Sequence, residues 1–267
     1  MTRLDLAAWT GRPPVGVLLA DVDGTLIGLE TYEAPPEVVE ELERLRAAGV
    51  ATVAVTSKTA AELAVLVRRL PLLPLAVAEG GAVLADLEAG EAEPVGPGRD
   101  RLVAALGAAR ARGWPVRGFA DMSVEEVMAR TGLDRDAAER AMTRLASEPF
   151  VVGSGPGGRE LGRLWEELGR EGLAVERGGR FFHLVGQGIH KGTGARRLLA
   201  RLEPQPPVVG AVGDAPNDLP MVALARHGFV LGGAVPAEAL PPRVRRIPVR
   251  GPYGFLAAAR RLRAALG

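Results

Sequence analysis

The chain has 267 residues, of which 47% are hydrophobic, so it can bury a sizeable core in one large domain or two smaller ones. Its charges nearly balance to a formal net charge of +1, and no basic stripe indicates a nucleic-acid partner. No apolar run approaches the roughly 20 residues of a membrane span, and residues 1–11 lack the apolar centre of a signal peptide. The absence of cysteine excludes disulfides and thiolate chemistry. We therefore expect a cytoplasmic protein with neither a membrane nor a nucleic-acid partner.

The basic residues are unusually uniform. Lysine occurs only at Lys58 and Lys191, and arginine is used at all other Lys/Arg positions. Together with abundant Ala, Gly and Pro, this bias indicates a GC-rich genome, and the lack of cysteine and the proline-rich loops fit a heat-adapted protein. Two lysines that persist in such a chain invite a functional explanation.

The first part of the chain alternates between strands and helices. Short apolar runs predict buried strands at 15–20, 50–55 and 75–78. Helical spacing of apolar residues predicts helices at 36–48 and 59–70, which end at a glycine and a proline respectively. This alternation is typical of a parallel sheet covered by helices.

The middle of the chain is amphipathic rather than continuously apolar. Its pattern predicts helices at 99–112, 123–130, 135–145 and 159–171, and strands at 115–120, 150–152, 173–177 and 181–185. The last helix of this part follows a glycine-rich run, residues 153–158. Half-buried strands of this kind suit an open sheet with one solvated face.

The first style returns after residue 192. We expect a helix at 194–202, a buried strand at 208–212, a helix at 219–225, a strand at 229–231 and a closing helix at 254–266. The predicted fold class is α/β, with a Rossmann-like parallel-sheet core and an inserted α+β domain. The core comprises residues 1–91 and 188–267, and the inserted domain, called the insert below, comprises residues 92–187.

The segment 21–26 reads D-V-D-G-T-L and directly follows the first predicted strand. Side chains at the carboxyl ends of parallel strands face the crevice where ligands bind. Asp21 and Asp23 can both point there, because Gly24 lets the chain turn away sharply. An Asp-Gly turn with an acidic helix cap would be the simpler reading, but the whole hexapeptide after an apolar strand favours a catalytic site.

A second acidic segment, residues 213–218, reads G-D-A-P-N-D and follows another apolar strand. Alone it could be an Asx turn with a helix cap at Asp218. Combined with the first segment, it brings three or four acids, including Asp214, into one crevice. So many like charges require a cation, and an all-oxygen set of ligands suits Mg²⁺.

Both lysines lie where a strand leads into a helix. The segment 56–59, T-S-K-T, opens a helix, where hydroxyl and backbone N–H groups form an anion site. Lys191 precedes the helix predicted from residue 194. A surface lysine is normally solvated, but lysine is also a compact point charge that suits a single phosphoryl oxygen. We interpret Lys191 as a clamp for a phosphoryl group and Lys58 as a second site residue.

Taken in chain order, these four segments resemble the pattern of the haloacid dehalogenase superfamily: D-x-D-G-T, a Ser or Thr after the second strand, a Lys, and G-D-x-x-N-D. The resemblance covers the whole chain. Within the superfamily, the insert resembles the mixed α/β cap domain of the sugar-phosphatase branch. The resemblance implies a Mg²⁺-dependent phosphatase whose cap domain selects the substrate.

Several shorter segments refine the resemblance. The pieces 118–123, 131–133, 148–150 and 180–184 look like the mannosyl-3-phosphoglycerate phosphatase family, which produces mannosylglycerate, a compatible solute of heat- and salt-adapted microbes. The implied partner is a small phosphorylated sugar-glycerate, bound by a monomer or homodimer. One departure is His190, which stands where the family pattern has an acidic residue before the lysine.

By resemblance, Asp21 is the nucleophile that forms an aspartyl-phosphate, and Asp23 is the general acid and then the base. Lys191 holds the phosphoryl group. The implied metal ligands are Asp21, the backbone carbonyl of Asp23, and Asp214, with Asp218 in reach or one shell out. The residues implied to contact the phosphoryl group or orient the site are either Thr56 or Ser57, together with Lys58 and Asn217.

The cap residues are less constrained by pattern. A glycerate carboxylate needs a cation or a helix N-terminus, for which Arg177, Arg180 and the glycine run 153–158 are candidates. His183 and Asp121 could bind sugar hydroxyls. Arg177 and Arg180 could equally be solvated charges, His183 could be a core histidine, and the glycine run could be a mobile loop.

Three other functions are compatible with the motifs. A phosphatase for sucrose phosphate or a hexose phosphate, and a phosphomannomutase, would use the same core. A catalytically silent sugar-phosphate sensor would need no second aspartate, so the presence of Asp23 argues against it.

Overall fold

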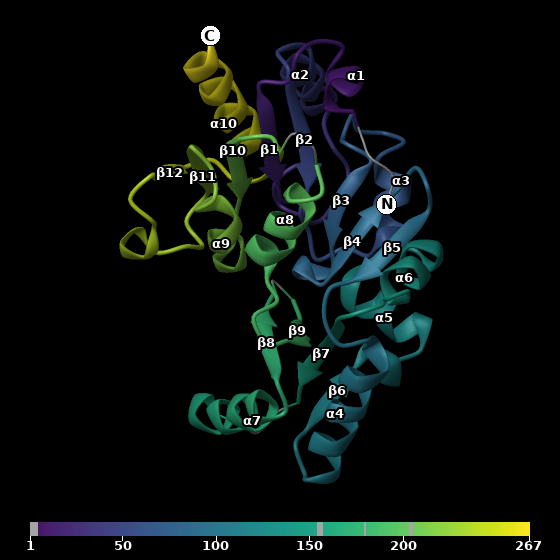
Figure 1. The fold of residues 1–267 in the computed structure, drawn as a ribbon. Helices are drawn as coiled ribbons and strands as arrows, with labels where there is room; N and C mark the ends of the chain where they lie inside the picture. The colour runs from purple at the N-terminus through teal and green to yellow at the C-terminus, as the bar shows by residue number, and fades with distance from the viewer. Residues whose placement is uncertain (1–4, 154–156, 179, 203–204) are drawn as a thin grey trace.

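The computed structural model describes residues 5–153, 157–178, 180–202 and 205–267. Its centre is a parallel sheet with the strand order β12-β11-β10-β1-β2 (Figure 1). The strands are β1 (Gly16–Ala20), β2 (Val50–Ala54), β10 (Val208–Gly213), β11 (His227–Leu231) and β12 (Val244–Ile247). The α/β class with a parallel-sheet core is therefore confirmed.

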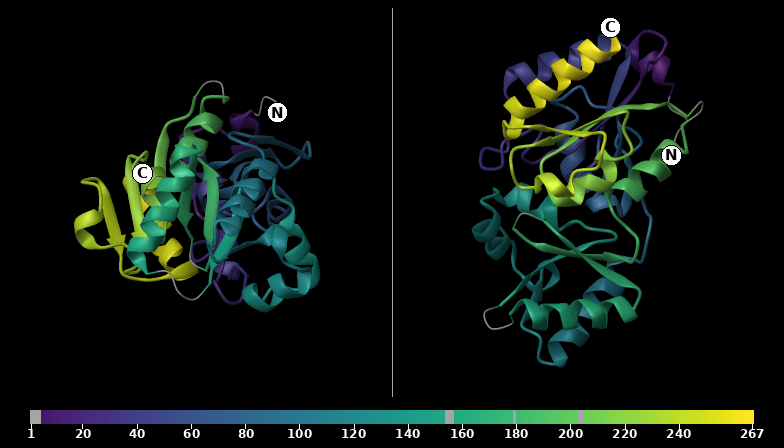
Figure 2. Two further views of the ribbon diagram at one scale, coloured as in Figure 1. Left: turned by 90° about the horizontal axis from the view of Figure 1, so that it is seen from below. Right: turned by 90° about the vertical axis from the view of Figure 1, so that its left-hand side faces the viewer.

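The sheet is covered by helices on both faces, as the alternation of side chains along β1 requires. Leu18 and Ala20 pack in the cluster that contains α2 (Pro36–Ala47) and α10 (Gly251–Leu266), which lie side by side in Figure 2. Val17 and Leu19 pack in the opposite cluster. The helices of that face are α1 (Leu6–Thr10), α8 (Lys191–Leu199) and α9 (Leu219–Val222).

A small antiparallel sheet extends the core beyond β2. It comprises β3 (Leu75–Ala78), β4 (Val83–Asp86) and β5 (Glu91–Pro94), and a parallel bridge between Val55 and Val77 joins it to the end of β2. Helix α3 (Ala60–Leu66) connects β2 to this extension. Short 3₁₀ helices complete the structure, at Glu79–Gly81, Phe119–Asp121, Pro216–Asp218 and Ala237–Ala239.

The insert is built on a four-stranded antiparallel sheet of order β6-β7-β9-β8, drawn below the core in Figure 1. Its strands are β6 (Val116–Gly118), β7 (Glu148–Val152), β8 (Leu173–Arg177) and β9 (Phe182–Gly186). Its helices are α4 (Arg99–Ala111), α5 (Val124–Thr131), α6 (Arg135–Met142) and α7 (Gly158–Arg170).

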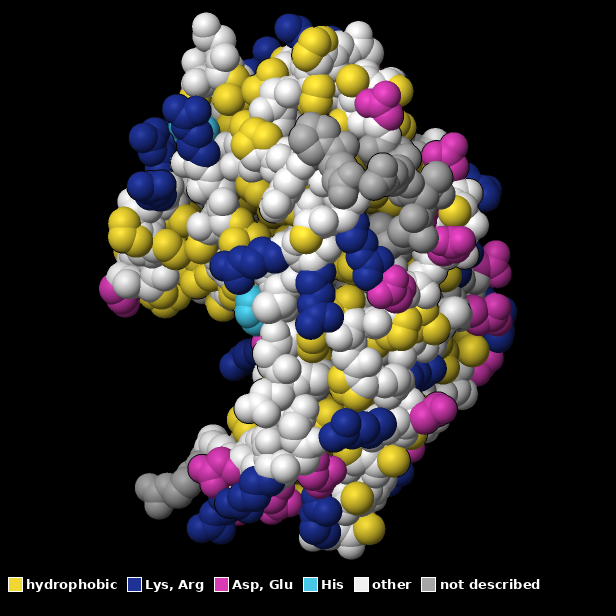
Figure 3. All heavy atoms as spheres, viewed as in Figure 1, with side chains coloured by type: hydrophobic (Ala, Val, Ile, Leu, Met, Phe, Trp, Pro, Cys, Tyr) yellow, Lys and Arg dark blue, Asp and Glu magenta, His cyan; other side chains and the backbone are white. Residues whose placement is uncertain are grey.

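The two faces of the insert's sheet have different environments. Phe150 of β7 and Leu184 of β9 are buried with side chains of α4 and α7. The alternate residues Pro149 and His183, which are paired across β7 and β9, line a cavity that also contains core residues. The less apolar face predicted from the sequence is therefore the face turned toward the core. Figure 3 shows the surface hollowed between these two parts of the molecule.

Among the α-helices and strands of the described residues, α1, β4, β5 and β12 were not predicted. Strand β5 spans the predicted boundary between core and insert at residues 91 and 92. The four-stranded sheet and its helices lie within residues 99–186, and the division of the chain into 1–91, 92–187 and 188–267 stays a prediction. Within the described part of the chain, no helix has the length and apolar character needed to cross a bilayer.

Candidate active site

The first acidic segment lies at the carboxyl end of β1. All five residues of β1 are buried, and the amide of Asp21 continues the sheet by donating to the carbonyl of Val212, 3.0 Å away. Gly24 has φ +76°, and a Cβ there would lie 2.6 Å from Oδ2 of Asp214. Glycine is therefore required twice at this position, for the turn and for the close approach of the two acidic segments.

The second acidic segment is held together by Asp218, which is fully buried. Its Oδ2 accepts hydrogen bonds from the amides of Asp214 and Ala215, each at 2.9 Å. Its other oxygen, Oδ1, lies 2.5 Å from Nζ of Lys191. Asp218 thus organises the loop after β10 and also faces the site.

Lys191 joins the two segments. It is the first residue of α8, its side chain is buried, and Nζ lies 2.6 Å from Oδ1 of Asp21. Although burial alone would lower it, the pKa of Lys191 is raised by the neighbouring carboxylates of Asp21 and Asp218. The amine is therefore charged at neutral pH.

Helix α8 begins with a well-defined cap at His190. Its Nδ1 accepts from the amide of Thr193 at 3.2 Å, and Oγ1 of Thr193 accepts in return from the amide of His190 at 2.9 Å. The residue that departs from the family pattern thus caps the helix that presents Lys191.

Three carboxylates form a cluster that fits a hard cation. One ligand oxygen each from Asp21, Asp214 and Asp218 lies within 4.8 Å of the others. Burial raises the pKa of Asp21 to about 8, opposed by Lys191 and reinforced by the other two acids, and raises that of Asp214 to about 6. One amine does not offset three acids, and oxygen donors alone suit Mg²⁺.

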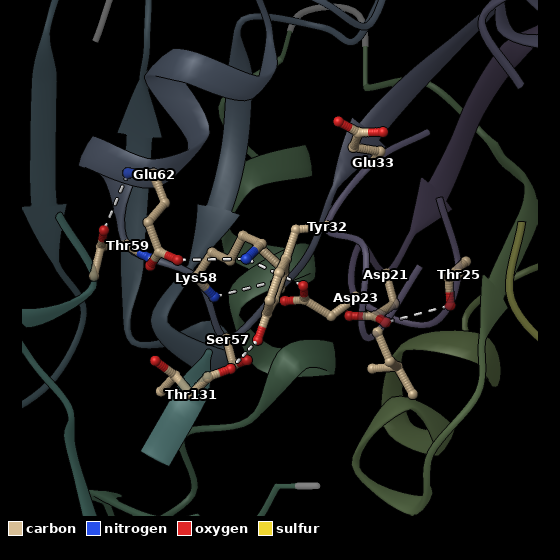
Figure 4. A network of polar contacts seen from close by, with 12 residues as sticks. Asp21, Asp23, Thr25, Tyr32, Glu33, Ser57, Lys58, Thr59, Glu62 and Thr131 are labelled. Carbon is tan, nitrogen blue, oxygen red and sulfur yellow. Dashed lines mark hydrogen bonds and ion pairs between the residues drawn. The ribbon is translucent and has the colours of Figure 1, made fainter. Parts of the chain in front are cut away.

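The carboxylate of Asp23 is engaged elsewhere, in a chain of ionic contacts (Figure 4). Its Oδ1 lies 3.1 Å from Nζ of Lys58, which lies 3.3 Å from Oε1 of Glu62 and 5.3 Å from the ring centre of Tyr32. Burial raises the pKa of Asp23, and Lys58 opposes that rise. Asp23 is therefore a half-buried acid beside the cluster of three carboxylates, with its own cationic partner.

Both parts of the molecule line one cavity of about 230 Å³. Ser57 lines it, whereas Thr56 is fully buried, and its Oγ1 accepts from the amide of Lys58 at 3.2 Å. Asn217 also lines the cavity, and its Oδ1 is buried with no hydrogen-bond partner in the described structure. The geometry favours Ser57 over Thr56 as a group that contacts a ligand.

The insert contributes some of the predicted residues to this cavity. His183 lines it, and burial lowers the pKa of this imidazole to about 3, with the charges of Arg144 and Lys191 adding to the effect. The exposed residue Arg180 also lines it, and its guanidinium donates to the carbonyl of Thr131 and to the hydroxyl of Tyr32. Arg180 therefore links the insert to the core.

The structure does not bring the other candidates of the insert to the cavity. Arg177 is exposed at the end of β8. Asp121 binds the guanidinium of Arg110 at 2.5 Å and the amide of Gly118 at 3.0 Å, so its carboxylate serves the fold of the insert. Of the glycine run 153–158, residues 154–156 lie outside the described residues.

Several cavity residues were not predicted as site residues, among them Tyr32, Glu62 and Arg144. Glu62 had a recognisable signal, because Thr59 and Glu62 form a capping box, with the amide of Thr59 donating to Glu62 at 2.8 Å. Tyr32 and Arg144 lie in segments with no motif that distinguishes them from packing residues.

Comparison with known proteins shows which class the chain resembles. Residues 163–238 match the family model of the haloacid dehalogenase-like hydrolases. A phosphatase of this superfamily from Bacteroides thetaiotaomicron superimposes with a TM-score of 0.68 at 21% identity, covering 95% of this chain and 96% of its own. A haloacid dehalogenase-like hydrolase from B. subtilis gives a TM-score of 0.68 at 17% identity over 93% and 99% of the two chains. The chain thus has the fold of the haloacid dehalogenase-like hydrolases and resembles them in sequence.

A particular relative is more similar in sequence. The glucosyl-3-phosphoglycerate/mannosyl-3-phosphoglycerate phosphatase of Persephonella marina is 28% identical over 221 residues, which cover 77% of this chain and 81% of the relative.

Proposed function

We propose that the protein is a phosphatase that hydrolyses a phosphomonoester through an aspartyl-phosphate on Asp21. The observation that carries the proposal is the buried contact of one amine with two acids, in which Lys191 Nζ lies 2.6 Å from Asp21 and 2.5 Å from Asp218. Phosphoryl transfer is catalysed mainly by positioning and by stabilising charge. A buried carboxylate beside a fixed cation and a cluster of oxygen ligands supplies both.

The nucleophilic step uses the carboxylate of Asp21. Lys191 holds its Oδ1 and the hydroxyl of Thr25 donates to its Oδ2 at 3.3 Å, so the orientation of the carboxylate is set before substrate binds. An oxygen of Asp21 bonds to phosphorus while the bond to the leaving oxygen breaks. Mg²⁺, held by Asp21, Asp214 and Asp218, would offset the repulsion between the carboxylate and the phosphoryl group. Lys191 and the Ser57 hydroxyl would stabilise the phosphoryl oxygens.

Asp23 provides the proton transfers. It lines the same cavity, and burial raises its pKa, which favours the protonated form that a general acid needs. It would protonate the leaving oxygen and then accept a proton from the water that hydrolyses the aspartyl-phosphate. Acid–base assistance of this kind contributes roughly 10²–10⁴-fold to rate.

We further propose mannosyl-3-phosphoglycerate as the substrate and mannosylglycerate as the product. The segments of the insert that resemble that phosphatase family support this choice, as does the name of the Persephonella marina relative. Three cations line the cavity in addition to Lys191, namely Lys58, Arg144 and Arg180, and this charge suits a substrate with a second anionic group.

The direct test is phosphate release by the purified protein with Mg²⁺ from a panel of phosphomonoesters. We expect mannosyl-3-phosphoglycerate and its glucosyl analogue to be hydrolysed with higher kcat/KM than sucrose 6-phosphate or hexose monophosphates. Faster release from a hexose monophosphate would remove the specific assignment. Interconversion of hexose phosphates without net phosphate release would identify a mutase instead.

A further inference from the structure

Arg144 places a buried guanidinium in the wall of the cavity. It follows α6, only 9% of the residue is exposed, and it lines the cavity together with Asp21 and Lys191. Its hydrogen bonds go to neutral acceptors. Nε donates to the carbonyl of Ala141 at 3.0 Å, Nη1 to the hydroxyl of Ser147 at 2.8 Å, and both Nη1 and Nη2 to the carbonyl of Ser57 at 3.2 and 3.3 Å.

The other buried cations of the cavity are paired with acids, but Arg144 is not. Lys191 contacts Asp21 and Asp218, and Lys58 contacts Asp23 and Glu62. Among the described residues, no carboxylate lies within 4.0 Å of the guanidinium of Arg144. Burying a charge without a counter-ion is costly, so a carboxylate from a ligand would be strongly favoured there.

The nearest route to an acid runs through Ser147. The hydroxyl of Ser147 donates to Oε2 of Glu79 at 2.7 Å, and Glu79 also accepts from the amides of Leu145 and Ala146. This arrangement fixes the loop that carries Arg144 without occupying all its donors. A guanidinium has five N–H groups, and the four contacts above leave one on Nη2 free.

The charge of Arg144 also acts within the cavity. The pKa of His183 is lowered to about 3 by burial first, then by Arg144 and Lys191. The field of the guanidinium therefore reaches the cavity wall formed by β9, where water does not screen it fully.

We propose that Arg144 is a carboxylate-binding subsite for the leaving group of the substrate. This inference rests on the proposed function, because a phosphoglycerate ester carries a carboxylate on the same three-carbon unit as its phosphoryl group. The free N–H of Nη2 can donate a charge-assisted hydrogen bond to one oxygen of this carboxylate. The subsite selects for the glycerate part of the substrate rather than for the sugar.

Arg180 is the rival cation, and its surroundings make it the weaker one. The residue is exposed, and its guanidinium donates to the carbonyls of Thr131 and Leu29 and to the hydroxyl of Tyr32. An exposed cation attracts a carboxylate less than a buried one, because water screens the charge.

The test compares two substrates that differ at the carboxyl group: mannosyl-3-phosphoglycerate and its uncharged carboxyl methyl ester. The readout is kcat/KM for the carboxylate substrate divided by kcat/KM for its methyl ester. It is measured for the wild type and for Arg144→Gln, Arg144→Lys, Arg180→Gln and Arg177→Gln. We expect Arg144→Gln to lower the ratio about 10- to 100-fold, mainly through KM of the carboxylate substrate. Arg144→Lys should lower it less, and the exposed Arg177 serves as the matched control whose replacement leaves the ratio unchanged.

Each other result is informative. An equal loss with both substrates in Arg144→Gln, or a ratio that falls with Arg180→Gln instead, would overturn the subsite, as would a wild type that uses both esters equally well. If Arg144→Gln does not fold, the ratio measured with Arg144→Lys decides, and an unchanged ratio there overturns the subsite. A wild type that hydrolyses neither ester would overturn the proposed function and the subsite with it.

Discussion

At the scale of single residues, the site depends on a carboxylate whose position is determined by three neighbours. Asp21 is bonded to Lys191 and Thr25 through its side chain and to Val212 through its amide. The orientation of Asp21 is therefore fixed. A different side chain at this position would leave the partners of its carboxylate without an acceptor.

Replacing Asp21 by Asn removes the nucleophile and leaves the shape of the site nearly intact. We expect turnover to fall by at least about 10³-fold, while binding of the product is retained. Steady-state phosphate release and calorimetric titration of mannosylglycerate would measure both. The exposed Asp100 of α4 is a matched control, and Asp100→Asn should retain full activity. Undiminished turnover in Asp21→Asn would exclude the covalent mechanism.

His183 makes the stability of the protein depend on pH. Its pKa is lowered from 6.5 to about 3 in the folded protein, chiefly by burial. Below pH 6.5 the unfolded chain therefore binds a proton that the folded protein does not, and the free energy of unfolding falls as pH falls. We expect His183→Gln to reduce this dependence between pH 6.5 and 4.5, by less than about 1.4 kcal/mol per pH unit because the imidazole is only half-buried.

Urea unfolding at several pH values would measure the effect, with pH 7.5 as the reference at which this histidine is neutral in both states. Equal slopes for the wild type and His183→Gln would show that another group causes the acid sensitivity.

At the scale of elements, the position of Lys191 depends on how closely α8 approaches its neighbours. A Cβ at Gly192 would lie 2.5 Å from the backbone carbonyl oxygen of Pro220 in α9. The contact is with backbone, so a larger residue must displace one of the two helices and, with α8, the amine of Lys191.

We therefore expect Gly192→Ala to lower both Tm and kcat, although alanine is the better helix former by about 1 kcal/mol. Gly162 in α7 is the matched control, because nothing lies within 4 Å of a Cβ at that position. Gly162→Ala should raise Tm slightly and leave kcat unchanged. Thermal unfolding and phosphate release of the two variants would decide, and a stabilised, fully active Gly192→Ala would contradict the account.

Burial explains some of the elements that sequence reasoning found and missed, although β4 is buried throughout and was not predicted. Strands β1, β2 and β3 are wholly buried, so their apolar runs are evident in the sequence. All residues of β5 are exposed. Strand β12 has an apolar residue at each end and two arginines between them, so neither strand has an apolar run to detect. Backbone pairing with a neighbouring strand, which no local pattern reveals, determines such edge strands.

At the scale of the whole molecule, metal binding should couple to stability. The acids Asp21, Asp214 and Asp218 come from two distant segments that only the folded chain brings together. A ligand that binds only the folded state raises its stability, by about 2.7 kcal/mol at a concentration of 100 Kd.

We expect saturating Mg²⁺ to raise Tm by roughly 5–10 °C over protein treated with a chelator. Asp214→Asn should lose most of this rise, while the exposed Asp100→Asn should keep it. Differential scanning calorimetry with and without Mg²⁺ would test the prediction. A rise that is unchanged in Asp214→Asn would place the metal elsewhere.

The sequence by itself determined the α/β core and the segments that form its acidic and lysine-bearing edge. It could do so because each of these segments follows a buried strand, and parallel strands end at one edge of a sheet. Only the tertiary structure decided which residues of the insert reach that edge. Arg144 and His183 line the cavity whereas Arg177 and Asp121 do not, because this depends on which face of the four-stranded sheet meets the core and on which arginines are buried there. Both properties arise from packing between segments far apart in the chain, which no local spacing encodes.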